Sequence, residues 1–110
     1  MTGFDEIKHE AFGYLAQVQA ENDKYREPCA EFLKFRELLD GAGIPWHDAT
    51  DSCDYFTMHR THGDGFSVIY GKHGYGASMG LLEARIDGRK DVDGWLTAEQ
   101  AFELVKEVAR

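Results

Sequence analysis

Residues 55–86 read YFTMHRTHGDGFSVIYGKHGYGASMGLLEARI. Three segments of this stretch alternate in side-chain character, namely 55–61, 66–70 and 81–86. Alternation with a period of two is typical of a strand that buries one face. Between the first two segments, HGDG at 62–65 supplies the glycines that a tight hairpin turn requires. We therefore predict a β-hairpin over 55–70 and a further strand after a glycine-spaced loop.

Helical spacing of apolar residues on both sides of this stretch predicts helices there. We expect one helix over 4–21 and a second over 28–39, where Pro28 suits the first turn. Thr97 and Gln100 match a capping box, which predicts a last helix over 98–109.

Short strands are expected on either side of the hairpin region, at 44–48 and 92–96, with a loop at 49–54. Because the connections are short, antiparallel pairing is favoured over crossover units. We predict an α+β fold with two N-terminal helices, a mainly antiparallel sheet of four to five strands, and a C-terminal helix packed on one face.

The two faces of this sheet are expected to differ in polarity. The helices should cover the most apolar series, which is Phe56, Met58, Phe66, Val68, Tyr70, Leu82, Ala84 and Ile86. The opposite face would then carry Tyr55, Thr57, His59, Thr61, Ser67, Leu81, Glu83 and Arg85.

Composition limits the classes of function. A chain of 110 residues is the size of one domain, and we assign 1–110 to a single α+β unit. Its formal net charge of −8 repels phosphate backbones, so we expect no direct binding to long nucleic acid. With no apolar run of bilayer length and no signal-peptide pattern, we expect no membrane association. Cys29 and Cys53 are too few for a disulfide framework, which favours reduced thiols in a cytoplasmic protein.

Metal and catalytic patterns are incomplete. The string DVDGWLT at 91–97 is similar to the middle of a calcium loop but lacks carboxylates at the first and twelfth positions. The histidines and cysteines lack the short spacing of a structural zinc site, and no string of a known catalytic family is present. We predict no metal and no other cofactor. The enzymatic alternative, a metal-dependent or acid–base hydrolase, would use His59, His62 and Glu83 near the hairpin.

A small-ligand site is expected on the sheet face that points away from the helices. His59, Glu83 and Arg85 would combine an imidazole with charges of both signs there. In the glycine-spaced loop, Tyr75 would stack on a base, and His73 or Arg85 would meet an anionic group. We expect Tyr75, His59 and Arg85 to line one concave surface. The predicted ligand-binding residues are His59, His73, Tyr75, Glu83 and Arg85, with a small nucleotide as the ligand.

Four strings resemble those of small uncharacterised proteins of bacterial mobile elements and prophages. They are GIPWHDATD (43–51), RTHGDGFSVIYGKHGYG (60–76), GLLE (80–83) and GWLTAEQ (94–100). The resemblance implies an accessory or anti-defence protein that acts by binding a protein partner. With the acidic charge and the missing catalytic string, it leads us to expect a binding module with a protein partner. A small-ligand or nucleotide binder is the first alternative, and the hydrolase is the second.

Overall fold

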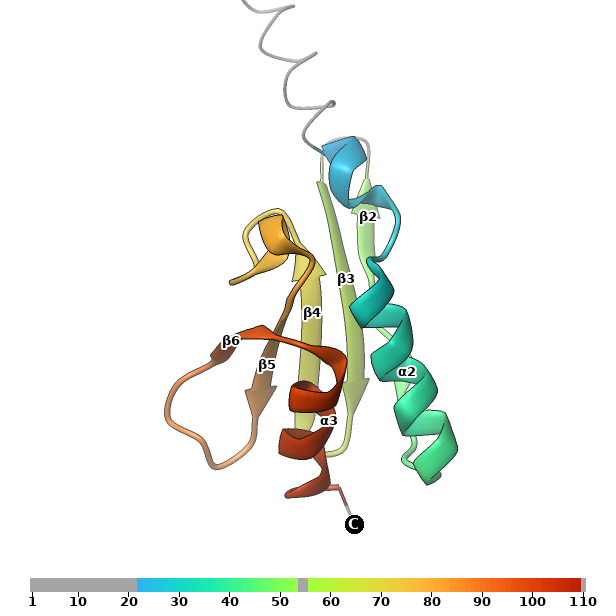
Figure 1. Cartoon of the computed structure of the whole chain (residues 1–110), viewed down its shortest axis with the longest axis vertical. Helices are drawn as coiled ribbons and strands as arrows, with labels where there is room; N and C mark the ends of the chain where they lie inside the picture. The colour runs from blue at the N-terminus through green and yellow to red at the C-terminus, as the bar shows by residue number, and fades with distance from the viewer. Residues whose placement is uncertain (1–21, 54–55, 110) are drawn as a thin grey trace, which may run out of the picture.

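Figure 1 shows the computed structural model of the chain, which describes residues 22–53 and 56–109. Residues 22–26 are helical. The following elements are α2 (Ala30–Ala42), β1 (His47–Asp48), β2 (Asp51–Cys53), β3 (Phe56–Gly63), β4 (Phe66–Gly71), the 3-10 helix η1 (Ala77–Met79), β5 (Leu82–Ile86), β6 (Asp93–Leu96) and α3 (Ala98–Lys106). The α+β class is confirmed, with a helix before the sheet and another after it. The helix expected over 4–21 lies outside the described residues.

The strands form one sheet in the order β1-β3-β4-β5-β6, and β2 shares with β1 the same edge of β3. Every pairing is antiparallel, as predicted. The sheet has six strands rather than four or five, because β2 forms within the segment expected to be a loop. β1 and β2 are separate because the Asp48 carboxylate accepts hydrogen bonds from the backbone N–H and the hydroxyl of Thr50. Such a local side-chain bond turns the chain between the two short strands.

The two helices begin and end at recognisable caps. α2 spans Ala30–Ala42 where 28–39 was predicted, and it ends at Gly43, whose φ of 68° is left-handed. α3 has the predicted capping box, because Thr97 and Gln100 each bond the other's backbone N–H through a side-chain oxygen. A hydrogen bond also joins the two helices, because Glu31 Oε2 of α2 accepts the Ala98 N–H of α3 at 2.7 Å.

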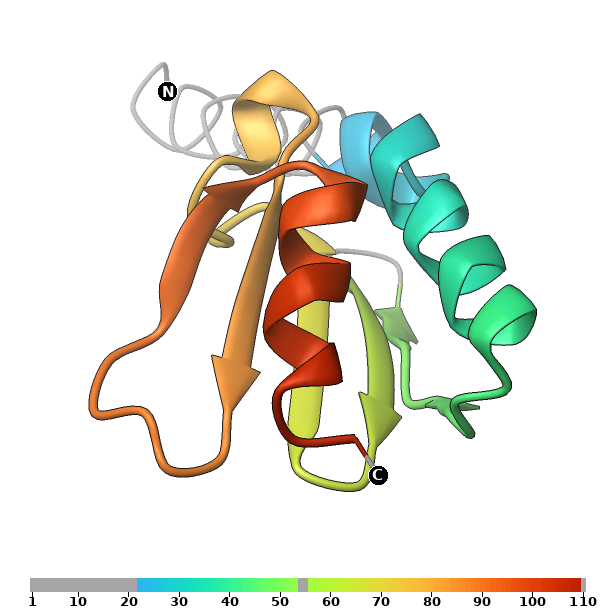
Figure 2. The same ribbon diagram turned by 60° about the horizontal axis from the view of Figure 1, so that its bottom comes forward.

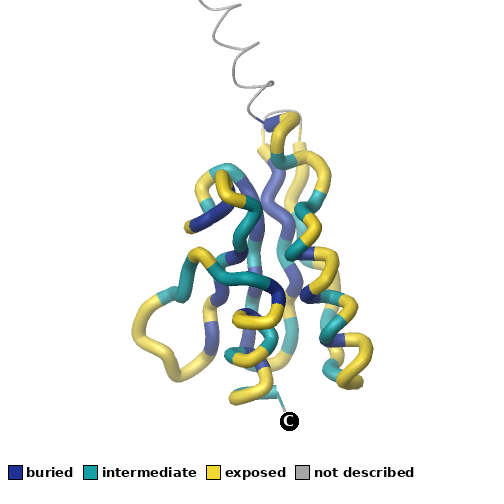
Figure 3. The backbone as a smooth tube through the Cα atoms, viewed as in Figure 1, coloured by how far each residue is buried: buried dark blue, intermediate teal, exposed yellow. Residues whose placement is uncertain are grey.

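Both helices pack on one face of the sheet, with α3 lying across its middle strands (Figure 2). The core between these layers consists of Phe32, Phe35, Leu39, Phe66, Val68, Tyr70, Ala77, Leu82, Ala84, Ile86, Ala98, Ala101 and Val105. Figure 3 shows the resulting alternation of buried and more exposed positions along the strands. The predicted inward faces of β4 and β5 are therefore confirmed.

The predicted faces of β3 are wrong. Thr57, His59 and Thr61 lie under the helices, and the alternate residues Met58 and Arg60 point the other way. The reason is register: directly opposite residues share a face, and the hairpin pairs Thr61 with Val68 and His59 with Tyr70. β3 continues to Gly63, so the loop is two residues long rather than the four that were predicted.

The side chain of Arg36 in α2 donates hydrogen bonds to polar groups of β3. Its Nε donates to Thr61 Oγ1 at 2.7 Å, and its Nη2 donates to the Arg60 carbonyl at 3.1 Å. The same Nη2 also bonds the Asp48 carboxylate at 3.1 Å. Hydrogen bonding by Thr50, and then by Arg36, lowers the pKa of Asp48 below its ordinary value. The guanidinium is held 4.6 Å from the ring centres of both Phe32 and Trp46.

His59 is satisfied by the helical segment that precedes α2. Its Nε2 lies 2.7 Å from the Tyr25 carbonyl oxygen, and since a carbonyl only accepts, Nε2 carries the proton and donates. Its ring stacks on that of Tyr70 with ring centroids 6.0 Å apart, and its centroid lies 5.8 Å from that of the Phe32 ring. This histidine is therefore a structural element of the layer between helices and sheet.

The two cysteines are free thiols, and they differ in environment. Cys29 occupies the N-cap position of α2 without a side-chain capping bond, its Sγ lies 3.6 Å from the Gly80 carbonyl oxygen, and burial raises the pKa of its thiol. Cys53 is exposed on β2. Within 22–53 and 56–109, no helix has the length and apolar character needed to cross a membrane.

We expect Arg36→Ala to lower the free energy of unfolding by about 1–3 kcal/mol, because it leaves the buried Thr61 hydroxyl without its Arg36 donor, while the Arg60 carbonyl keeps the Ala49 N–H. Chemical denaturation monitored by circular dichroism measures this. Arg26→Ala is the matched control, since it removes an exposed ion pair with Asp23 and should cost less than about 1 kcal/mol. Equal losses in both variants would contradict the role assigned to Arg36.

His59→Phe keeps an aromatic ring against Tyr70 and Phe32 but removes the donor to the Tyr25 carbonyl. The free energy of unfolding should fall by about 1–3 kcal/mol. The same substitution at the exposed His73 should change it by less than about 0.5 kcal/mol. If His59→Phe unfolds at the same denaturant concentration as the wild type, the hydrogen bond does not contribute to stability.

Candidate functional site

The sheet face opposite the helices, called the open face below, carries two cross-strand rows of side chains. The first row contains successive register partners from β1, β3, β4 and β5, which are His47, His62, Ser67 and Arg85. The second row contains Arg60, Ile69 and Glu83 from β3, β4 and β5. Neighbouring strands lie about 4.8 Å apart, so the first row extends over roughly 14 Å. Strand pairing alone thus assembles these polar groups from distant parts of the sequence.

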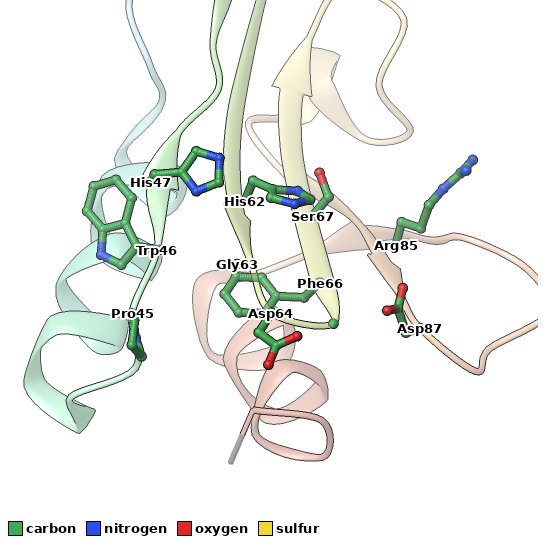
Figure 4. A pocket seen from close by; sticks show the side chains of 11 residues that line it. Pro45, Trp46, His47, His62, Gly63, Asp64, Phe66, Ser67, Arg85 and Asp87 are labelled. Atoms are coloured by element: carbon green, nitrogen blue, oxygen red, sulfur yellow. The ribbon is translucent and has the colours of Figure 1, made fainter.

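Two adjoining cavities are built on these rows. A cavity of about 620 Å³ follows the first row and continues past the end of the hairpin to Pro45, Trp46 and Asp64, as Figure 4 shows. A second cavity of about 370 Å³ lies between the rows. His62, Ser67 and Arg85 line both cavities. Volumes of this order suit a small-molecule ligand.

Arg60 is the least satisfied polar residue of this surface. Its Nε is buried and has no hydrogen-bond partner in the part of the chain that the structure describes. Its backbone, in contrast, is fully engaged, because the N–H donates to Thr50 Oγ1 and the carbonyl accepts from Ala49 and Arg36. A buried donor without an acceptor is rare in folded proteins. Because this atom is closed to solvent, an acceptor in the smaller cavity would reach Arg60 through its terminal nitrogens, or reach Nε after the side chain rotates.

The smaller cavity contains guanidinium groups that have no carboxylate partner among the described residues. Arg60 and Arg85 form no ion pair with any carboxylate of residues 22–53 or 56–109. Glu83 lies in the smaller cavity with them, and its Oε1 accepts the Tyr75 N–H at 3.3 Å. The cavity thus holds two guanidinium groups for one carboxylate, although the whole chain is acidic.

The residues predicted to bind a ligand do not share one site. Glu83 and Arg85 line the smaller cavity, as expected for the face away from the helices. His59 is on the wrong face, only 8% exposed beneath α2, so the concave surface predicted for Tyr75, His59 and Arg85 does not exist. Tyr75 and His73 line neither cavity. His59 is likewise separated from His62 and Glu83, so the proposed hydrolase residues are not assembled.

Tyr75 belongs instead to an exposed aromatic pair. Its ring stacks on Trp95 of β6, with centroids 5.3 Å apart and planes at 12°, and the two side chains are 52% and 57% exposed. Trp95 adopts a φ of 53°, which is uncommon for a residue other than glycine. A Cβ at Gly94 would lie 2.5 Å from Tyr75 Cβ, so a glycine is required for this close approach. We call Tyr75 and Trp95 the aromatic pair.

Sequence reasoning missed Arg60 and His47 as members of the site. In the predicted register Arg60 lies with Phe56 and Met58 on the side expected to face the helices, and His47 falls in the short strand at 44–48, whose pairing was not predicted. The signal that finds Arg60 is the hairpin register, which places it opposite Ile69, whereas His47 requires the pairing of β1 with β3, which places it opposite His62.

In the string 91–97, which is similar to part of a calcium loop, Asp93 forms an ion pair with Arg89. Asp93 accepts two hydrogen bonds from the Arg89 guanidinium, at 2.8 and 3.1 Å. Among the described residues, no group of three or more histidine, cysteine, aspartate or glutamate side chains could hold a metal ion.

Comparison with known proteins leaves the open face as the main evidence for function. The chain matches no protein-family model, no curated protein and no solved structure.

Proposed function

We propose that the protein is a binding module that takes up a small phosphorylated ligand, such as a nucleotide, on the open face. The unpartnered Nε of Arg60, buried at the smaller cavity, is the observation that carries this proposal. An anionic oxygen is the acceptor that such a group pairs with best, because charge-assisted hydrogen bonds are about twice as strong as neutral ones.

The neighbours of Arg60 fit a phosphate group. Arg85 adds a second planar guanidinium, which suits bidentate contact with phosphate oxygens. Ser67 and His62 continue the row of Arg85, with His62 two residues from Arg60 on β3, and they add a hydroxyl and an imidazole. The larger cavity extends from these residues toward Trp46, so a phosphate near Arg85 leaves space for a planar group near the indole.

The net charge of −8 does not oppose this assignment at short range. Exposed charges more than about 10 Å apart are largely screened at moderate ionic strength. Within that range the smaller cavity offers two guanidinium groups against the Glu83 carboxylate, while Asp64 and Asp87 line the adjoining larger cavity. Glu83 would favour a ligand that also offers a hydrogen-bond donor, such as a ribose hydroxyl.

Titration calorimetry with adenosine monophosphate, inorganic phosphate and adenosine tests the proposal. We expect adenosine monophosphate to bind, adenosine to bind far more weakly, and Arg60→Gln or Arg85→Gln to lower the affinity tenfold or more, as expected for a lost bond to a charged group. Arg26→Gln makes the same change of charge outside the cavities and should have no effect. Failure of both phosphorylated probes to bind, or an equal loss in Arg26→Gln, would overturn the proposal.

A second candidate function is the binding of a protein partner through the aromatic pair. Two exposed, mutually stacked rings on a strained backbone are favourable for an interface, where tyrosine and tryptophan dominate the binding energy. This candidate agrees with the resemblance to accessory proteins of mobile elements and prophages. We infer a cytoplasmic location for either function, with which the free cysteines are consistent.

For a protein that the wild type retains on an affinity column, Trp95→Ala should weaken binding by more than about tenfold, the loss expected at a central interface residue. Leu33→Ala, which truncates an exposed apolar residue of α2, should leave the affinity unchanged. Biolayer interferometry with the purified partner measures both. Binding that survives Trp95→Ala would exclude the aromatic pair as the interface.

A further inference from the structure

Two histidines of the first row form a contact that the fold does not require. His47 and His62 are direct register partners on β1 and β3, and their ring centroids lie 5.0 Å apart with planes at 64°. Both side chains are exposed and line the larger cavity, where Figure 4 shows the two rings next to each other. Neither ring forms a hydrogen bond within residues 22–53 and 56–109. Their nitrogen lone pairs are thus available.

The separation of the rings matches that of two imidazoles on one metal ion. A metal binds a histidine nitrogen at about 2.1 Å, which places it roughly 3.2 Å from the ring centre. Two such ligands at a near-tetrahedral angle have ring centres roughly 5 Å apart. The observed 5.0 Å therefore requires little movement beyond rotation of side chains that are already exposed.

We propose that His47 and His62 form a two-histidine binding site for a divalent transition metal ion such as zinc. Since the described residues supply no third ligand of the usual types, the ion would keep at least two positions for water or an outside ligand. Ser67 and Arg85 continue the same row, so an anionic oxygen on the metal would also lie near a hydroxyl and a guanidinium. The metal site shares His62 with the proposed phosphate contact but does not depend on Arg60.

The spacing rule that argued against zinc does not apply to this pair. It describes ligands within one turn or loop, whereas strand pairing brings His47 and His62 together across 14 intervening residues. Imidazole is a ligand that suits zinc, copper and nickel, while a calcium or magnesium ion prefers oxygen.

Titration of the full, untagged chain with zinc chloride tests the site by calorimetry. We expect one equivalent to bind, and His47→Gln or His62→Gln to weaken binding by about tenfold or more, as for loss of a metal ligand. The double variant should bind no more weakly than either single variant, because one imidazole alone cannot chelate. In nuclear magnetic resonance spectra, the ring signals of these two histidines should shift together while those of His59 stay in place.

Two controls address other zinc ligands on the surface. His73→Gln removes an exposed histidine outside the cavity, and Cys53→Ser removes the exposed thiol; both should bind zinc like the wild type. The proposal is overturned if either control loses binding as strongly as the pair variants, or if both single variants of the pair retain wild-type affinity. Equal melting temperatures of all variants without metal establish that the losses are not caused by unfolding.

Discussion

The two-residue turn at Asp64 and Gly65 determines which side chains meet the helices and which meet solvent. Gly63 and Phe66 are register partners, and Gly65 supplies the positive φ of 83° that closes the turn. Since the side-chain period of a strand is two, this pairing assigns a face to every residue of β3 once the apolar face of β4 is buried. A slip by one residue would place Arg60 and His62 under the helices.

The same register places polar residues of β3 in the core, where side-chain and backbone groups of the helical segments form hydrogen bonds with them. Thr61 is completely buried, and only the Arg36 guanidinium reaches its hydroxyl from α2. His59 depends in the same way on the Tyr25 carbonyl. Because a buried polar group without a partner costs roughly 1–3 kcal/mol, the position of α2 and of the segment before it is coupled to the polar pattern of β3. The helical layer is thus aligned by hydrogen bonds as well as by apolar packing.

Local chemistry made much of the fold predictable. The alternation in β4 and β5, the hairpin and the capping box at Thr97 each depend on neighbouring residues, and the structure contains all of them. The face of β3 was mispredicted because apolarity was taken from Phe56 and Met58 individually, although the hairpin already requires Thr61 to share the side of Val68. The break between β1 and β2 depends on the Asp48–Thr50 bonds, which no periodicity indicates. Within the site, Glu83 and Arg85 were predictable from an alternating strand, whereas Arg60 and His47 required the register.

The open face differs from the helix-covered face in how its polar groups are satisfied. Under the helices, Thr61 and His59 have partners within the chain, whereas across the sheet the buried Arg60 Nε has none in the described residues. The fold has no need of an arginine opposite Ile69, since a shorter polar side chain would suit the strand and leave no buried donor. This guanidinium carries a buried donor without a partner in the described part of the chain and lines the same cavity as Arg85, which is the arrangement on which the proposed ligand contact rests. Stability therefore explains the first set of polar contacts, whereas the proposed ligand would supply the missing partner in the second.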